Sequence, residues 1–221
     1  MAGPRLTLDH VLVAVADLDR SAADFDQRYG LRSVEGGRHP GVGTANRIVP
    51  LGKDYIELIA VVDPSEAAAG WRGRRVANAV ARGETFATWA LRTTDLEAFR
   101  EHCKTLGVPL PPPSDGARTK PDGTVLRWRV QELHEDAEVG AVPFVIEWHV
   151  PDAEHPAALP VGQPSGVNGI ARVVVGTTSP EAERQLREVI GDGVPFEVRQ
   201  SQRDRILEVA LSSPRGEVVI T

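Results

Sequence analysis

Apolar and polar positions alternate along the first regular segment of the chain, residues 7–14. Leu8, His10 and Leu12 fall on one face of a strand with this pattern, and Val11 falls on the other. Both faces are apolar around His10, so we expect its imidazole to be enclosed. It is either a core histidine satisfied by one hydrogen bond or part of a functional site.

Residues 6–62 continue with the pattern of a helix and then of further strands. The apolar face of the helix carries Ala22, Phe25 and Tyr29. Asp19 is placed to cap its start, and Gly30 is placed to end it. Residues 43–52 and 54–62 are typical of two strands joined by a Gly-Lys-Asp turn. Residues 6–62 are therefore predicted to form one βαβββ module.

The same order returns in residues 85–150. A strand that begins at Phe86 precedes a helix with one apolar face: Leu96, Phe99, Cys103 and Leu106. Three short motifs match between the two segments in the same order: ADL with TDL, GTANR with GTVLR, and YIEL with VIEW. This agreement indicates an internal repeat in which Glu57 corresponds to Glu147.

A third, partial copy is predicted in residues 165–221. Ser179 can cap its helix, Pro180 suits the first helical position, and Gly191 can end it. The preceding residues, 151–166, are rich in proline and glycine and indicate a module boundary. The apolar helix face would be exposed in isolation. We therefore expect this copy to pack onto the first two or onto another subunit, which leaves a homodimer open.

Composition narrows the function classes. The chain has 221 residues and a formal net charge of −6, which argues against a nucleic-acid groove or an anionic membrane surface as its main partner. It has no apolar stretch long enough for a membrane span and no apolar core of a signal peptide near its start. With a single cysteine, Cys103, the expected location is the cytoplasm.

These motifs together resemble the vicinal oxygen chelate superfamily, and within it the glyoxalase-like domains (glyoxalase, bleomycin resistance and dioxygenase type). The carriers are LDHVLVAVADLDRS, GTANRIVPLGKDYIELIAV and PFVIEWHVPDAEHP, and the resemblance covers residues 6–157. It implies an α+β fold. Paired βαβββ modules would form an open mixed β-barrel around a cavity, with the third, partial module beside it.

In metal-dependent members of this superfamily, the ligands come from the first and last strands of each module. Carried over by position, the resemblance implies His10, Glu57, Thr88 and Glu147, although histidine is typical at the position of Thr88. His149 lies two residues after Glu147 and could supply the missing imidazole. A divalent metal (Zn, Ni, Mn or Fe) would then bind His10, Glu57, Glu147 and His149. The alternative is that both glutamates are buried acids paired with arginines.

Several polar residues of the strands are candidates for binding the substrate: Thr88, Arg92, Arg47 and Arg127. Inward arginines would hold an anionic ligand by paired hydrogen bonds, whereas outward ones would be solvated around an inward Trp128. Trp89 and Trp148 are expected on the face opposite Thr88 and Glu147, packed under helices.

The resulting hypothesis is a metal-assisted enzyme acting on a small oxygenated metabolite. The metal would polarise an oxygen, and Glu57 or Glu147 would move the proton. Whether such an enzyme is a lyase, an isomerase or a dioxygenase is left open. The alternative is a non-catalytic protein of the same fold that sequesters a small molecule. No nucleotide cofactor is expected, because the Gly-rich residues 36–46 precede no helix that could bind phosphate. These residues are predicted to be a loop over the cavity, with His39 as a contact.

Overall fold

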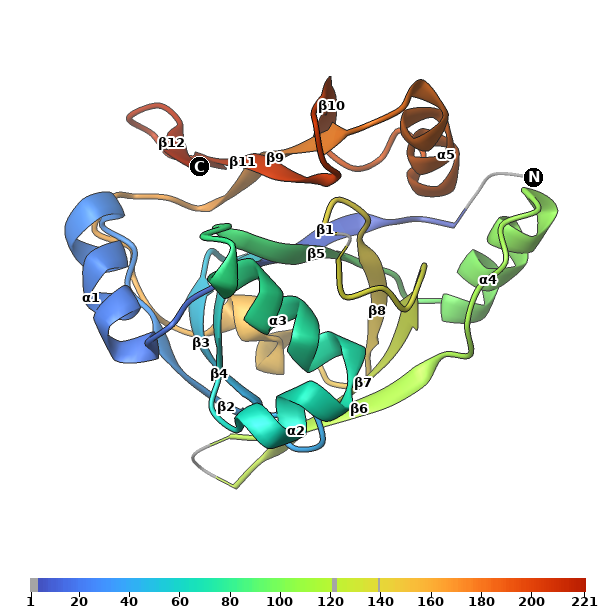
Figure 1. The fold of residues 1–221 in the computed structure, drawn as a ribbon. Coiled ribbons are helices and arrows are strands. Elements are labelled where there is room, and N and C mark those ends of the chain that lie inside the picture. The colour runs from blue at the N-terminus through green and yellow to red at the C-terminus, as the bar shows by residue number, and fades with distance from the viewer. Residues whose placement is uncertain (1–3, 121–122, 139) are drawn as a thin grey trace.

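The computed structural model describes residues 4–120, 123–138 and 140–221 (Figure 1). The first part of the chain forms β1 (Thr7–Ala14), α1 (Leu18–Tyr29), β2 (Val34–His39), β3 (Thr44–Pro50), β4 (Tyr55–Val61), α2 (Pro64–Ala69) and α3 (Trp71–Ala81). The second part forms β5 (Phe86–Arg92), α4 (Leu96–Thr105), β6 (Ser114–Thr119), β7 (Val125–Glu132) and β8 (Phe144–Trp148). Two 3₁₀ turns, η1 (Asp152–Glu154) and η2 (Pro156–Ala158), lead to β9 (Gly169–Thr177), α5 (Pro180–Ile190), β10 (Phe196–Gln200), β11 (Arg205–Ser212) and β12 (Val218–Ile220).

Eight strands form one mixed sheet in the order β2-β3-β4-β1-β5-β8-β7-β6. In each half the first strand pairs in parallel with the last, β1 with β4 and β5 with β8, and the other two strands follow as antiparallel neighbours. The halves meet where β1 and β5 run antiparallel. This α+β architecture, an eight-stranded barrel-like sheet, is the one expected from the sequence.

The register between β1 and β5 is symmetric about one pair, Val11 opposite Trp89. The neighbouring pairs in this ladder are Leu12 with Thr88 and His10 with Ala90. Thr88 therefore occupies in the second half the position that His10 occupies in the first, as the ADL and TDL motifs predict.

The last strands of the two halves do not align as their sequences suggest. Leu12 pairs with Glu57 in the first half, and Ala90, the counterpart of Leu12, pairs with Phe144 in the second. Phe144, rather than Glu147, thus corresponds to Glu57. Glu147 lies three residues further on and so faces the opposite side of the sheet, because side chains alternate along a strand. The match of YIEL with VIEW gave the wrong register.

The barrel closes where its two edge strands, β2 and β6, lie beside each other. Gly36 and Gly37 of β2 allow this approach. A Cβ at Gly36 would lie 2.7 Å from Arg118 Nη1, and one at Gly37 would lie 2.8 Å from the Thr119 carbonyl oxygen. The sequence predicted a loop for residues 36–46, but only the turn after His39 is irregular.

Helices α2 and α3 form an insertion between the halves to which the sequence analysis assigned no structure. The α3 helix contacts β1, β4 and β5 and covers one side of the barrel (Figure 1). Its Val76 and Ala79 pack against Leu12, Ile59 and Ala87. The insertion therefore closes the barrel interior on this side, and Arg72 and Arg75 of α3 line the cavity within.

The caps of two helices show how local sequence sets the ends of these elements. Asp17, not the predicted Asp19, caps α1 by accepting hydrogen bonds from the backbone N–H groups of Asp19 and Arg20. Gly30 ends the helix in the left-handed conformation, with φ of 62°. Ser179 caps α5 as predicted.

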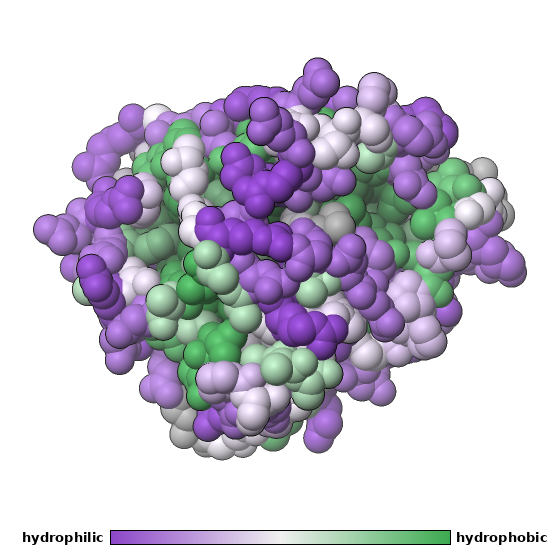
Figure 2. Space-filling model, viewed as in Figure 1, coloured by the Kyte–Doolittle hydropathy of each residue, from purple (hydrophilic) through white to green (hydrophobic). Residues whose placement is uncertain are grey.

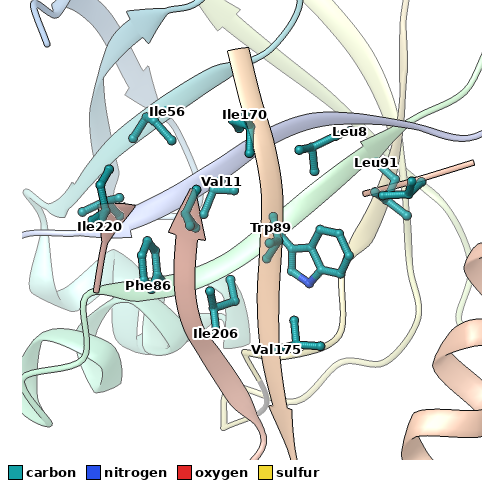
Figure 3. Close-up of a cluster of buried hydrophobic side chains, with 14 of the residues drawn as sticks. Leu8, Val11, Ile56, Phe86, Trp89, Leu91, Ile170, Val175, Ile206 and Ile220 are labelled. Carbon is teal, nitrogen blue, oxygen red and sulfur yellow. The ribbon is translucent and has the colours of Figure 1, made fainter. Parts of the chain in front are cut away.

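Strands β9–β12 and α5 form a second layer over β1 and β5 (Figure 1). Their sheet order, β10-β9-β11-β12, differs from that of either half, because β9 pairs in parallel with β10 rather than with the last strand. The layer shares one apolar core with the barrel. In Figure 3, Ile170, Val175, Ile206 and Ile220 face residues of the barrel strands: Leu8, Val11, Ile56, Phe86, Trp89 and Leu91. Trp89 thus packs under this sheet rather than under a helix.

The face that carries α3 is largely polar, with apolar residues visible between the polar ones (Figure 2). In the described parts of the chain, no helix has the length and apolar character needed to cross a membrane.

We expect the second layer to be required for stability. Val209 of β11 is fully buried in the shared core, whereas Val219 of β12 is 40% exposed. Val209→Asp should lower the free energy of unfolding by at least ~3 kcal/mol, because it buries an unpaired charge. Val219→Asp is the matched control and should change it by less than ~0.5 kcal/mol. Urea denaturation measures both. Equal stability of the two variants would contradict the shared core.

Candidate functional site

The barrel encloses a cavity of about 390 Å³, within the size range of small-molecule sites. Every strand of the barrel and helix α3 contribute to its wall. Its polar lining includes His10, His39, Thr44, Asn46, Glu57, Arg72, Arg75, Thr88, Arg118 and Glu132, and its aromatic lining is Tyr55, Trp128, Phe144 and Trp148.

A β-bulge in β1 places two consecutive polar side chains in one hydrogen-bond network. The ladder between β1 and β5 shifts between Leu8 and His10, which leaves Asp9 as the extra residue. A bulge breaks the strict alternation of faces and re-aims side chains. His10 faces the cavity, and Asp9 lies behind it with no exposed surface.

Four groups surround the buried Asp9 carboxylate. His10 Nδ1 donates to Oδ1 at 2.6 Å, and His155 Nε2 donates to Oδ2 at 3.1 Å. Trp148 Nε1 also donates to Oδ2, at 3.2 Å, and Arg92 Nε lies 3.9 Å away. The backbone N–H of Ala157 donates to His155 Nδ1, which places the proton of that imidazole on Nε2. Asp9 is thus fully partnered, as a buried charge requires.

On its other side, His10 reaches a second carboxylate. His10 Nε2 lies 3.4 Å from Glu57 Oε2, while Asn46 Nδ2 donates to Glu57 Oε1 at 2.5 Å. The Tyr55 ring stacks on the imidazole with centroids 4.4 Å apart and fixes its plane. Asp9, His10 and Glu57 therefore form a carboxylate–imidazole–carboxylate chain whose last member lines the cavity.

The electrostatics of this chain favour its ionised form. Burial alone lowers the pKa of His10, but hydrogen bonds and charge from Asp9 and Glu57 outweigh it and raise the pKa well above the ordinary 6.5. Burial raises the pKa of both carboxyls, yet the hydrogen bonds from His10 and its charge bring the pKa of each below its usual range. His39 differs, because burial lowers its pKa.

The structure brings only part of the predicted site together. His10, Glu57 and Thr88 line the cavity, but Glu147 and His149 do not. The Glu147 carboxylate accepts a hydrogen bond from the backbone N–H of Leu96 at the start of α4, and His149 lies 3.3 Å from it on the outer side. The physical reason is the register of β8, which turns Trp148 inward and Glu147 outward.

None of the three predicted arginines lines the cavity. Arg47 pairs with Asp19 of α1 at 3.0 Å, and Arg127 is exposed. Arg92 stands behind the wall, near Asp9. The arginine that does reach the cavity from a barrel strand is Arg118. Sequence reasoning missed it because no strand was assigned before the Pro-Asp-Gly motif of residues 121–123, although such a motif is a turn signal that implies strands on both sides.

Asp9 and His155 were also missed. Asp9 was missed because the alternation of apolar and polar residues does not predict a bulge. An aspartate in an apolar strand is nevertheless a signal of a buried partner. His155 lies in residues 151–166, which the sequence indicated as a module boundary, but it is 3% exposed and bonded to Asp9. Nothing in the local sequence around His155 predicts this long-range contact.

Comparison with known proteins identifies the family. A sequence model described as the glyoxalase-like domain matches residues 8–190. The chain belongs to this glyoxalase-like family.

One solved structure supports the fold of this glyoxalase-like chain, and two further ones are similar over about two thirds of it. A Staphylococcus aureus protein described as hypothetical is 18% identical, with a TM-score of 0.75 over 91% of this chain and 88% of that one. Methylmalonyl-CoA epimerase from Mycobacterium tuberculosis is 25% identical, with a TM-score of 0.45 over 63% and 86% of the two chains. A Streptomyces coelicolor methylmalonyl-CoA epimerase variant in complex with 2-nitronate-propionyl-CoA is 17% identical, with a TM-score of 0.47 over 66% and 97%. None of the curated proteins matches the chain.

The side chains of this glyoxalase-like protein do not fit the four-ligand metal site that the superfamily resemblance implies. Thr88 and Phe144 stand at the two positions of the second half that correspond to His10 and Glu57. Both ring nitrogens of His10 already face carboxylates. Among the described residues, no group of three or more His, Cys, Asp or Glu side chains is arranged to hold a metal ion.

The contacts of His10 predict that it contributes nothing to metal binding. Zinc, nickel, manganese and iron(II) should each bind the wild type no more tightly than they bind His10→Ala, because His10 has no free nitrogen to offer. Titration calorimetry on metal-stripped protein measures this. Tight binding to the wild type that is lost in His10→Ala would contradict this prediction and show that His10 is a metal ligand.

The ion-paired state of His10 predicts a pH-dependent stability. A raised pKa in the folded protein stabilises it fully below the unfolded value of 6.5, and this contribution is lost as the pH rises above it. The lowered pKa values of Asp9 and Glu57 add stability that is lost as the pH falls below about 4. His10→Gln should therefore cost about 1–3 kcal/mol near pH 6 and less near pH 9.

Urea denaturation of the wild type and the variant between pH 5 and pH 10 measures this difference. His149→Gln is the control, because the His149 side chain is 47% exposed and should show almost no cost at any pH. A cost of His10→Gln that is constant across this range would indicate that His10 is an uncharged core histidine.

Proposed function

We propose that the protein is an enzyme that moves a proton on a small oxygenated molecule held in the barrel cavity. Glu57 is the base, and His10 is the hydrogen-bond and proton donor to an oxygen of the substrate. The observation that carries the proposal is the buried Asp9–His10–Glu57 chain, which ends at the cavity wall. A hydrogen-bonded carboxylate behind an imidazole orients the ring and stabilises its protonated form, as catalytic proton-transfer sites require.

The contacts of Glu57 support its role as the base. Its carboxylate is held from two sides, by Asn46 at 2.5 Å and by His10 at 3.4 Å, so its position is fixed before any ligand binds. A substrate oxygen that takes over the hydrogen bond from His10 removes the main partner of Glu57. The carboxylate is then buried with one partner fewer and gains affinity for a proton. Binding and activation of the base are thus coupled.

The chemistry that follows is enolisation. Glu57 takes a proton from the carbon next to a carbonyl group, and the electron pair moves onto the carbonyl oxygen. The imidazolium of His10 stabilises the negative charge that develops there by donating its Nε2 hydrogen bond. Return of the proton to a different carbon completes an isomerisation, whereas its return to the same carbon regenerates the substrate and is seen as hydrogen exchange with the solvent. No role falls to Glu147 in this scheme, because it lies outside the cavity.

The aromatic lining favours a second candidate, a protein that binds and sequesters a small molecule without reaction. Tyr55, Trp128, Phe144 and Trp148 give the cavity a large apolar surface. Such a protein needs the cavity but not the Asp9–His10–Glu57 chain. The two functions therefore differ in their dependence on Glu57. A homodimer stays a prediction in either case.

The test is exchange of carbon-bound hydrogen. Wild-type protein in D₂O, incubated with a panel of small ketones and oxo acids, should catalyse hydrogen–deuterium exchange next to the carbonyl group, measured by proton NMR. Glu57→Gln should reduce this rate by at least ~100-fold, since general-base catalysis contributes about that much. Glu147→Gln is the matched control, with the same substitution on the outer face, and should retain the wild-type rate.

Two results would contradict the proposal. Equal exchange by the wild type and Glu57→Gln would remove Glu57 from the reaction. Binding of panel members with no exchange above background would favour the sequestering protein instead.

A further inference from the structure

Arg118 enters the cavity at the seam between the two edge strands of the barrel. It lies on β6 and is 4% exposed. Its Cγ and Cδ atoms lie 3.1 and 3.2 Å from the position of a Cβ at Gly37, so its stem runs along the backbone of β2. The guanidinium group is thereby carried to the same wall as Asn46.

The other cationic groups of the cavity have partners. Arg72 pairs with Glu132 at 3.1 Å and donates to Ser114, and Arg75 donates to the Asp136 carbonyl oxygen at 2.7 Å. His10 is shared between its two carboxylates. In the described ranges of the chain, by contrast, no carboxylate lies within 4.0 Å of the Arg118 guanidinium.

An unpaired acceptor lies next to Arg118. Asn46 Oδ1 is buried and has no hydrogen-bond partner among the described residues. Its orientation is set, because the Nδ2 atom of the same amide donates to Glu57. A Cβ at Gly36 would lie 2.0 Å from Asn46 Oδ1 and 2.7 Å from Arg118 Nη1. A cationic donor and a neutral acceptor thus lie close to each other against the backbone of Gly36, and both side chains line the cavity.

A buried charge and a buried acceptor without partners each reduce stability. Features that break the rules of packing in this way are expected where a ligand completes the site. An arginine fork matches a carboxylate by paired hydrogen bonds, and an amide oxygen accepts a hydrogen bond from a hydroxyl or enol group.

We propose that Arg118 binds the carboxylate of the substrate, so that the substrates are small 2-oxo or 2-hydroxy carboxylates. This inference rests on the proposed function and adds the class of molecule to it. The carboxylate lies at Arg118, and the neighbouring keto or hydroxyl oxygen accepts a hydrogen bond from His10. As a hydroxyl or enol, this oxygen also donates to Asn46 Oδ1, and the alkyl part packs on the aromatic wall. A carboxylate suits the site better than a phosphate, because a dianion beside Glu57 would meet a single unpaired cation.

The experiment compares two ligands of similar shape, 2-oxohexanoate and the uncharged 2-oxohexanamide. Titration calorimetry of the wild type and Arg118→Met measures both affinities. Loss of a charged hydrogen-bond pair should weaken binding of 2-oxohexanoate about ten- to hundred-fold and leave the amide almost unchanged. Arg199→Met, on the exposed strand β10 of the other sheet, is the control and should bind both ligands as the wild type does.

A wild type that does not bind 2-oxohexanoate, or an Arg118→Met variant that binds it with wild-type affinity, would overturn the inference. So would an equal loss for both ligands. If Arg118→Met does not fold, NMR of ¹⁵N-arginine-labelled wild type decides. The Arg118 Nε–H signal should shift with 2-oxohexanoate and not with the amide, and its failure to do so would overturn the inference.

A further variant separates this inference from the proposed function. Glu57→Gln should still bind 2-oxohexanoate but should not exchange its C3 hydrogens. Charge-dependent binding at Arg118 without exchange in the wild type would sustain the carboxylate site and reject the enzyme. Exchange of uncharged ketones and 2-oxohexanoate at equal rates would sustain the enzyme and reject the carboxylate site.

Discussion

The ion pair between Asp9 and His10 is the interaction on which the rest of the site depends. It is formed by neighbours in sequence, and only the bulge in β1 lets both join one network. Asp9 in turn holds the segment after β8 in place through His155. The other ring nitrogen of His10 faces the Glu57 carboxylate and stabilises its ionised form. The proposed base Glu57, the barrel wall and the connecting segment are therefore coupled through one buried carboxylate.

Symmetry within the barrel explains why the site is one-sided. The two halves share their strand order, yet the positions in the second half that match His10 and Glu57 hold Thr88 and Phe144. A site with ligands from both halves could surround a metal ion. Here the first half supplies the carboxylate–imidazole–carboxylate chain, and the second half supplies the hydroxyl of Thr88 and an aromatic surface. Arg118 of β6, where the two edge strands meet, adds a positive charge to the cavity wall.

Much of the fold could be predicted from the sequence, because hydrophobic periodicity and capping residues mark β1, α1, α4 and α5 directly. The site could be predicted only in part. The positions carried over from the resemblance included His10 and Thr88, which both line the cavity, but a three-residue shift in β8 reversed the faces of Glu147 and Trp148. Register depends on pairing between strands, which short motifs do not encode. The contacts of Asp9 with His155 join residues 146 positions apart and have no local signature.

The most direct test of this account is the protonation state of His10 in the folded protein. ¹⁵N NMR of histidine-labelled wild type at pH 7.5 should show both ring nitrogens of His10 protonated, because each faces a carboxylate. Asp9→Asn should return the ring to a neutral form at the same pH. A neutral single tautomer of His10 in the wild type would contradict the carboxylate–imidazole–carboxylate chain and the function built on it.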